Sequence, residues 1–169
     1  VGRADTRTTR CDALRRDGVS FGLIVPNARR ALDLARGNKR VRSTLIGTAP
    51  DYTLLHGMRF VLGGMFDARD VRDAQRVCAL GATPARALFG EDNPLGATLL
   101  IPGRAPCTVI GVLAGMGREI GGNDLDDFVL MPLTSYARML GEENYSNIEI
   151  SPAPGVPLTA AREEADEIL

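Results

Sequence analysis

The sequence predicts an α+β fold in which mixed sheets are combined with short helices. Apolar residues alternate with polar ones in several short segments, and Val19, Phe21, Leu23 and Val25 show this period of two clearly. Other segments carry helix start and stop signals at short spacing. The 19 glycines and 10 prolines among 169 residues indicate frequent turns between these elements.

The first part of the chain is predicted to form a helix followed by strands. Residues 10–17 are a helix candidate, with Thr9 as the N-cap and Gly18 as the stop. The alternation at 19–25 predicts a strand with one buried face. Residues 28–47 are predicted to be a hairpin around Gly37-Asn38, although residues 31–35 are also compatible with a helix.

The middle of the chain is predicted to hold short elements separated by turns. In order, these are a helical turn after 49–52, an apolar segment at 60–62 ended by Gly63-Gly64, a turn or short helix at 67–73, a strand at 76–80 and a helix at 85–89. Thr83 and Pro84 are placed as the N-cap and first-turn proline of that helix, and Gly90 and Pro94-Leu95-Gly96 end it.

The last part of the chain is predicted to alternate strands and helices. Segments 97–101 and 106–113 flank Pro102-Gly103 and are expected to pair antiparallel. The remaining expectations are a loop at 115–127, a strand at 128–131, a helix from a Thr134 cap to Gly141, a strand at 147–151 and an amphipathic helix at 158–169.

The charge distribution gives no support to a nucleic-acid partner. Residues 1–42 hold 11 of the 20 Lys and Arg but only 4 of the 21 Asp and Glu. Arg36, Lys39 and Arg40 flank a turn at Gly37-Asn38, and no aromatic stacking platform or nucleic-acid motif accompanies these cations. We therefore interpret them as a solvated surface and predict no nucleic-acid binding.

The residues that carry chemistry do not form a familiar catalytic or metal pattern. The glycines of 115–122 lack the Walker lysine and a following helix, so a mobile loop is the preferred interpretation over a phosphate loop. Asp124, Asp126 and Asp127 could hold a hard cation, but solvated turns are the usual explanation. The single histidine, His56, has no evident nucleophile or ligand partner and is expected to be half exposed. We predict no enzyme activity, no cofactor and no metal.

The three cysteines, Cys11, Cys78 and Cys107, lack metal-ligand spacing. One disulfide at most is compatible with this number. Because Cys78 and Cys107 fall in apolar, strand-like segments, the simplest expectation is that they are free, buried, small hydrophobic residues.

The order of these signals from about residue 12 to 169 resembles the periplasmic core domain of MacB-type (MacB/FtsX-type) ABC transporter permeases. The matching pieces are Gly47-x-x-Pro50-Asp51-Tyr52, Gly63 with Phe66 and Asp70, Leu88-Phe89 through Pro94-Leu95-Gly96, Val109-Ile110-Gly111-Val112, and Pro132-Leu133-Thr134. One departure is Gly64, where the family usually has arginine.

The resemblance implies an architecture and a cellular setting. A porter-like subdomain of strand-helix units would comprise residues 1–47 and 107–169, with 48–106 as an inserted, smaller α/β subdomain. The domain would lie on the periplasmic side of the bacterial inner membrane, in a dimeric permease driven by a cytoplasmic ABC ATPase. Tripartite efflux members of the family also contact a periplasmic adaptor and an outer-membrane channel. The longest nearly apolar run, 107–116, is about half the ~20 residues of a membrane helix, so the membrane segments that the resemblance implies would flank this chain.

Two functional expectations follow from the resemblance. The terminal segments would act as stalks that convert membrane-helix motion into a rigid-body shift of the domain. A glycine-rich, acidic loop would contact partner proteins, and its candidate residues are Met116, Gly117, Arg118, Glu119, Ile120, Gly121, Gly122, Asn123 and Asp124. An uninvolved flexible loop is the alternative for this segment. For the whole chain the alternative is a free-standing periplasmic ligand-binding module, which predicts an apolar pocket with convergent polar groups.

Overall fold

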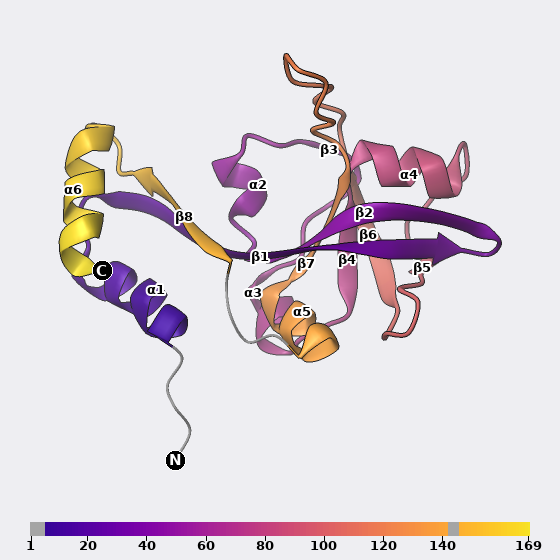
Figure 1. Cartoon of the computed structure of the whole chain (residues 1–169), viewed down its shortest axis with the longest axis horizontal. Helices are drawn as coiled ribbons and strands as arrows, with labels where there is room; N and C mark the ends of the chain where they lie inside the picture. The colour runs from indigo at the N-terminus through magenta and orange to yellow at the C-terminus, as the bar shows by residue number, and fades with distance from the viewer. Residues whose placement is uncertain (1–5, 142–145) are drawn as a thin grey trace.

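The computed structural model describes residues 6–141 and 146–169. The molecule is elongated, with a sheet-based body at one end and a small group of two helices and two strand segments at the other (Figure 1). Within the described ranges, eight strands form one mixed sheet in the order β3-β6-β4-β7-β2-β1-β8, and β5 pairs with β6. The predicted α+β class is confirmed.

The longest strand, β1 (Phe21–Arg36), connects the two ends of the molecule. Its first part pairs antiparallel with β8 (Asn147–Pro152), up to the pair Asn27 and Asn147. From Ala28 onward it pairs with β2 (Lys39–Thr48) around the Gly37-Asn38 turn, where Gly37 has a φ of 59°. The hairpin prediction is confirmed, and β1 changes its partner strand between Asn27 and Ala28.

The rest of the sheet extends from β2 with changing strand direction. Strand β7 (Phe128–Pro132) runs parallel to β2, and β4 (Val77–Leu80) runs antiparallel to β7. Strand β6 (Cys107–Leu113) runs parallel to β4 and also pairs antiparallel with β3 (Phe60–Gly63) and β5 (Thr98–Leu99). The predicted pairing across Pro102-Gly103 is therefore confirmed, although β5 is shorter than expected.

Six helices lie in the described part of the chain, close to the predicted places: α1 (Thr6–Asp17), α2 (Tyr52–Leu55), α3 (Ala68–Arg72), α4 (Ala82–Phe89), α5 (Leu133–Leu140) and α6 (Leu158–Ile168). Helix α3 begins with a capping box, in which Asp67 accepts hydrogen bonds from Arg69 N and Asp70 N, and the Asp70 carboxylate accepts one from Asp67 N. This local pairing explains why so short and polar a segment is helical.

The three threonine N-caps predicted from sequence are wrong. Thr9 lies inside α1, Thr83 lies inside α4 behind Gly81, and Thr134 lies inside α5 behind Pro132. Thr83 and Thr134 use their hydroxyls for contacts distant in the sequence, with Asp124 Oδ2 and with the Val71 carbonyl respectively. Since N-cap propensity is local, a distant acceptor can override it.

Two hydrophobic cores lie on opposite faces of the sheet, because neighbouring strand residues point to opposite sides. Leu45 and Val129 belong to the core that α4 and α5 cover. Ile46 and Leu130 belong to the other core, which is covered by Tyr52 of α2 and by Phe66. Strand β7 is therefore buried along its whole length, and β2 is buried from Leu45 to Thr48.

Gly47 is required by close packing between β2 and α5. A Cβ atom at this position would lie 2.5 Å from Cβ and Cγ of Tyr136, whose side chain is fully buried. Any larger residue at 47 would therefore push α5 away from the sheet.

Cys78 and Cys107 form a disulfide, which corrects the expectation that both are free. They lie on the adjacent parallel strands β4 and β6, with their Cα atoms 6.0 Å apart, and the bond encloses α4 and β5. Sequence reasoning recognised the apolar strands but could not tell that they are neighbours. Cys11 is free and buried in α1.

The division into 1–47 with 107–169 and an inserted 48–106 stays a prediction. Strands β3, β4 and β5 come from the predicted insertion, and they join the same sheet as β6 and β7.

Candidate partner-contact loop

The loop between β6 and β7, residues 114–127, projects from the body of the molecule (Figure 1). It is the predicted partner-contact segment, and the structure brings its candidate residues together at one projection. Residues 116–123 are exposed, and Asp124 is half-buried. The segment leads into strand β7 and not into a helix, unlike the loop of a phosphate-loop motif.

Asp126 holds the base of this loop. Its side chain is only 8% exposed, and its two carboxylate oxygens accept hydrogen bonds from Met116 N at 2.6 Å and Gly117 N at 3.0 Å. Its carbonyl accepts a further bond from Thr83 N at 3.2 Å. The two ends of the loop are thus joined to each other and to the start of α4.

Asp124 makes a second connection between the loop and α4. Its Oδ2 accepts a hydrogen bond from the Thr83 hydroxyl at 2.7 Å, and its Oδ1 accepts one from Asp126 N at 2.9 Å. These bonds, with the Thr83 hydroxyl contributing most, lower the pKa of Asp124 below its ordinary value. The carboxylate is therefore kept ionised in a structural role.

The three neighbouring aspartates do not converge on a common point. Asp127 Oδ1 accepts a hydrogen bond from the Ser43 hydroxyl at 2.7 Å, while Asp124 and Asp126 bind the donors described above. Among the described residues, no group of three or more acidic, histidine or cysteine side chains is arranged to hold a metal ion. The interpretation of these acids as solvated turn residues is wrong for Asp126, which is buried.

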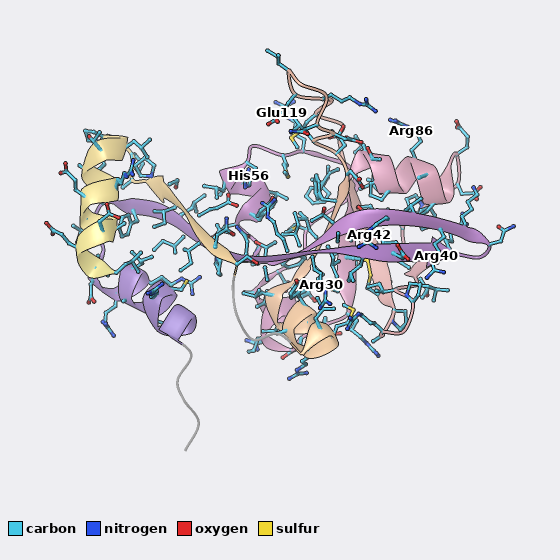
Figure 2. All side chains as sticks on the ribbon, viewed as in Figure 1. Arg30, Arg40, Arg42, His56, Arg86 and Glu119 are labelled. Atoms are coloured by element: carbon cyan, nitrogen blue, oxygen red, sulfur yellow. A yellow bond between two sulfur atoms is a disulfide. The ribbon has the colours of Figure 1, made fainter. Side chains whose placement is uncertain are left out.

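The tip of the loop is a tight, glycine-rich turn. Glu119 N donates to Asn123 O and Gly122 N donates to Glu119 O, each at 3.0 Å, and Gly121 has a φ of 121° that favours glycine. The Ile120 side chain is fully exposed at this tip, and Figure 2 labels the adjacent Glu119 on the same projection. The loop can therefore present an apolar side chain from a fixed base.

A surface groove of about 660 Å³ begins at the base of the loop and was not predicted from sequence. It runs from Gly115 along α4 and the edge strand β3. Val61 and Leu62 line it and are 61% and 39% exposed. The sequence feature that marks this groove is the pair of apolar residues directly before Gly63-Gly64. The sequence pattern alone does not reveal that this strand lies at the edge of the sheet.

His56 has partners that sequence reasoning did not identify. Its Nε2 lies 2.6 Å from Glu149 Oε2 of β8, and its ring lies 4.4 Å from that of Tyr52. Arg29 Nη2 donates to the Tyr52 hydroxyl at 3.1 Å and to Glu149 Oε1 at 3.4 Å. Burial raises the pKa of Tyr52, so its hydroxyl stays neutral. This group, the junction cluster, lies where β1 changes partners.

Gly64 departs from the pattern of the resembled family, and the structure shows how the site accommodates glycine. Its N–H donates to Ile110 O at 3.1 Å, and a Cβ at this position would meet open space. The backbone therefore makes the contact with β6, and a longer side chain would project outward.

Comparisons with known proteins identify the family and the fold of this chain. The family model described as the MacB-like periplasmic core domain matches residues 3–168. The macrolide export ATP-binding/permease protein MacB of Rhodospirillum rubrum is 39% identical over 109 residues, which are 63% of this chain and 17% of that protein. The protein of the same name from Chlorobium phaeobacteroides is 32% identical over 146 residues, 83% of this chain and 22% of its own length. The chain thus spans about a fifth of the length of these curated relatives.

Solved structures share the fold at low sequence identity. The periplasmic region of MacB from Actinobacillus actinomycetemcomitans has a TM-score of 0.83 at 21% identity, with 96% of this chain and 72% of that chain covered. The extracellular domain of the noncanonic ABC-type transporter YknZ from Gram-positive bacteria has a TM-score of 0.81 at 20% identity, with 95% and 80% covered. No helix in the described ranges has the length and apolar character needed to cross a bilayer. Since the family model matches nearly the whole chain, this protein belongs to the MacB-like periplasmic core domain family.

Proposed function

We propose that this chain is the periplasmic domain of an ABC transporter permease, in which it transmits ATP-driven conformational change and contacts partner proteins. The observation that carries the proposal is the arrangement of the two terminal helices. Helices α1 and α6 pack against each other at one end of the molecule, where α1 precedes β1 and α6 follows β8, and these two strands pair antiparallel (Figure 1). Membrane helices joined to this end would move the body through a single connection.

The terminal end is held together by a carboxylate that bridges α6 to the start of β1. Glu164 of α6 accepts hydrogen bonds from Val19 N at 2.8 Å and Ser20 N at 3.1 Å. Displacement of either helix would therefore reach β1. This coupling favours a shift of the domain as one body over independent motion of the two stalks.

A buried polar network that adjoins the junction cluster stiffens the connection between the terminal end and the body. Asn27 and Thr48 are fully buried at the change of strand partner, and Thr48 Oγ1 donates to Asn27 Oδ1 at 2.6 Å. Asn27 Nδ2 in turn donates to Glu149 Oε1 at 2.8 Å. A satisfied, buried polar network of this kind fixes one arrangement of the strands, which supports transmission by rigid-body movement.

A periplasmic location is further supported by the Cys78–Cys107 disulfide, since disulfides persist mainly in oxidising compartments such as the periplasm. We also propose that the full-length permease is a dimer and that a cytoplasmic ABC ATPase drives its motion.

Transmission can be tested by softening the connection in the full-length permease. A Gly-Ser insertion of about four residues between Gly18 and Val19 gives a flexible link between α1 and β1. We expect export to fall about tenfold or more while ATP hydrolysis continues, because motion would be absorbed by the insertion. Both quantities are measured in membrane vesicles.

The matched control carries the same insertion between Gly37 and Asn38, an exposed turn that lies outside this connection. It should leave export nearly unchanged. Normal export by the Gly18–Val19 insertion variant would contradict the transmission proposal.

Partner contact is assigned to the loop 116–124 because its anchored base presents Ile120 to solvent. Ile120→Asp should reduce capture of the permease's periplasmic adaptor by about tenfold, since an apolar contact is replaced by a charge. Pull-down with the purified chain measures this. Leu54→Asp is the control, because Leu54 is an exposed apolar residue on α2, outside the loop. If the Ile120→Asp and Gly121→Pro variants both capture as much adaptor as the parent protein does, the loop has no role in partner contact.

A further inference from the structure

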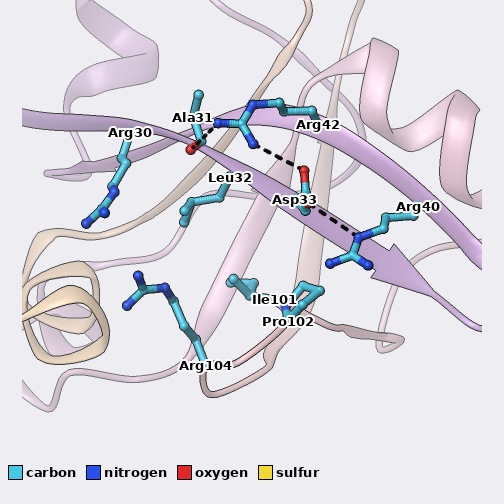
Figure 3. A pocket seen from close by; sticks show the side chains of 9 residues that line it. All are labelled: Arg30, Ala31, Leu32, Asp33, Arg40, Arg42, Ile101, Pro102 and Arg104. Atoms are coloured by element: carbon cyan, nitrogen blue, oxygen red, sulfur yellow. Dashed lines mark hydrogen bonds and ion pairs between the residues drawn. The ribbon is translucent and has the colours of Figure 1, made fainter.

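A pocket lined by four arginines lies on the β1–β2 hairpin, away from the candidate loop. It has a volume of about 320 Å³, at the lower end of small-molecule sites. Arg30, Arg40 and Arg42 come from the hairpin, and Arg104 comes from the turn that leads to β6 (Figure 3). The apolar floor is formed by Ile101 and Pro102.

Asp33 is the one carboxylate among the described residues that line this pocket. Asp33 Oδ1 lies 3.3 Å from Arg42 Nη1, and Asp33 Oδ2 lies 3.4 Å from Arg40 Nε. Arg104 is held by a hydrogen bond from its Nη1 to Met139 O at 3.2 Å, which leaves its other N–H groups for a further acceptor. Arg40, Arg42 and Arg104 alone exceed the single negative charge of Asp33 by two positive charges.

The edge of β1 adds backbone donors to the same pocket. Arg29 N donates to Ser146 Oγ and Ala35 N donates to Leu100 O, so both N–H groups point away from β2. Because the direction alternates along an antiparallel strand, the N–H and C=O groups of Ala31 and Asp33 also point to this side, and the Ala31 carbonyl accepts a hydrogen bond from Arg42 Nη2 at 3.5 Å. Both residues line the pocket.

We propose that this pocket binds a phosphomonoester group, from either a free metabolite or a lipid headgroup. Guanidinium groups bind phosphate oxygens through paired, charge-assisted hydrogen bonds. A phosphomonoester carries about −1.5 to −2 charges near neutral pH, so it compensates the positive excess better than a carboxylate does. Asp33 occupies part of the guanidinium donors in the free protein and competes with the ligand.

The first test titrates the chain with glycerol 3-phosphate by calorimetry at fixed ionic strength. Saturable binding is expected, and Arg40→Gln with Arg42→Gln should weaken it about tenfold or more. The matched control is Arg16→Gln with Arg72→Gln, which removes the same charge from two exposed arginines that also pair with aspartates. The control should change the affinity by less than about twofold.

Asp33→Asn tests the proposal through a gain in affinity, which a loss of folding cannot produce. Removal of the competing carboxylate should tighten binding by about threefold or more. Affinity that is unchanged or weakened in Asp33→Asn contradicts the proposal, as does equal weakening in the two double-arginine variants.

The second test distinguishes the source of the phosphate. Sedimentation with phosphatidylcholine vesicles, with and without phosphatidic acid, is compared for the parent and both double variants. Binding that requires phosphatidic acid and the pocket arginines assigns the site to a lipid headgroup, whereas binding of glycerol 3-phosphate alone assigns it to a free metabolite. Absence of saturable binding to both probes overturns the proposal.

Discussion

Single side chains fix the places where this chain changes direction. Asp126 closes the base of the projecting loop, Asp67 starts α3, and Glu164 joins α6 to the link after α1. Each of these carboxylates accepts hydrogen bonds from two backbone N–H groups. Acidic residues therefore stabilise turns and helix starts here by satisfying donors that no regular element would bind.

Glu164 gives a prediction at this scale. Hydrogen bonds from Ser20, and then from Val19 N, lower the pKa of Glu164 below its ordinary value. A lowered pKa in the folded state contributes stability above the unfolded-state pKa, and this contribution is lost as pH falls through the folded-state pKa. Glu164→Gln should therefore be less stable than the parent at about pH 7, with a difference that shrinks near pH 3.

Urea unfolding of both proteins at the two pH values measures this difference. Glu167→Gln, an exposed residue on the same helix, is the control and should show no such dependence. A difference between Glu164→Gln and the parent that stays constant with pH would contradict the role of Glu164.

At the scale of elements, the disulfide is the strongest single constraint. It joins β4 to β6 across a sequence separation of 29 residues. Closing a loop of this length restricts the unfolded chain, which corresponds to about 3 to 4 kcal/mol of stability. Reduction by dithiothreitol should lower the free energy of unfolding by about this amount.

The control for this prediction is the double variant Cys78→Ala with Cys107→Ala. It should already have the lower stability, and dithiothreitol should cause no further loss. A large effect of dithiothreitol on the double variant would show that the reductant acts elsewhere.

Most elements could be predicted from the sequence because their signals are local. The alternation at 19–25 indicated the first strand, which begins at Phe21 and leaves Val19 exposed. The Gly37-Asn38 turn indicated the hairpin, and Gly18 and Gly141 marked helix ends correctly. What the sequence could not show were pairings between distant segments. The neighbours of Thr83 and Cys78 depend on which strands are adjacent, and no local pattern contains that information.

The position of the candidate loop could be predicted from its composition. The hydrogen bonds that hold its base could not. Glycine and acid between two strands indicated a loop, and the structure places it at a projection. The burial of Asp126 depends on the packing of α4 beside the strands, and the groove along Val61 depends on β3 being an edge strand. Both are properties of the assembled sheet.

At the scale of the whole molecule, the two ends differ in how much apolar surface they bury. The body places β2 and β7 between two hydrophobic cores. The terminal end relies on a few residues, among which Cys11 and Leu14 of α1 and Ala161 and Ala165 of α6 are buried. Local opening should therefore begin at the terminal end.

Amide hydrogen exchange tests this difference. Amides of α1 and α6 should exchange about tenfold or more faster than those of β2 and β7, because their opening does not require disruption of the two cores. Mass spectrometry of peptic fragments resolves these segments. Equal protection of all four elements would show that the molecule opens as a single cooperative unit.

The contact between α1 and α6 has a practical consequence for protein engineering. Because the first and last helices lie side by side, the fold can be grafted into a surface turn of another protein without forcing apart the host residues on either side. A circular permutant can likewise be designed with a linker that joins α6 to α1 and with new ends at the exposed Gly37-Asn38 turn. The domain can thus be transferred between proteins as a single unit.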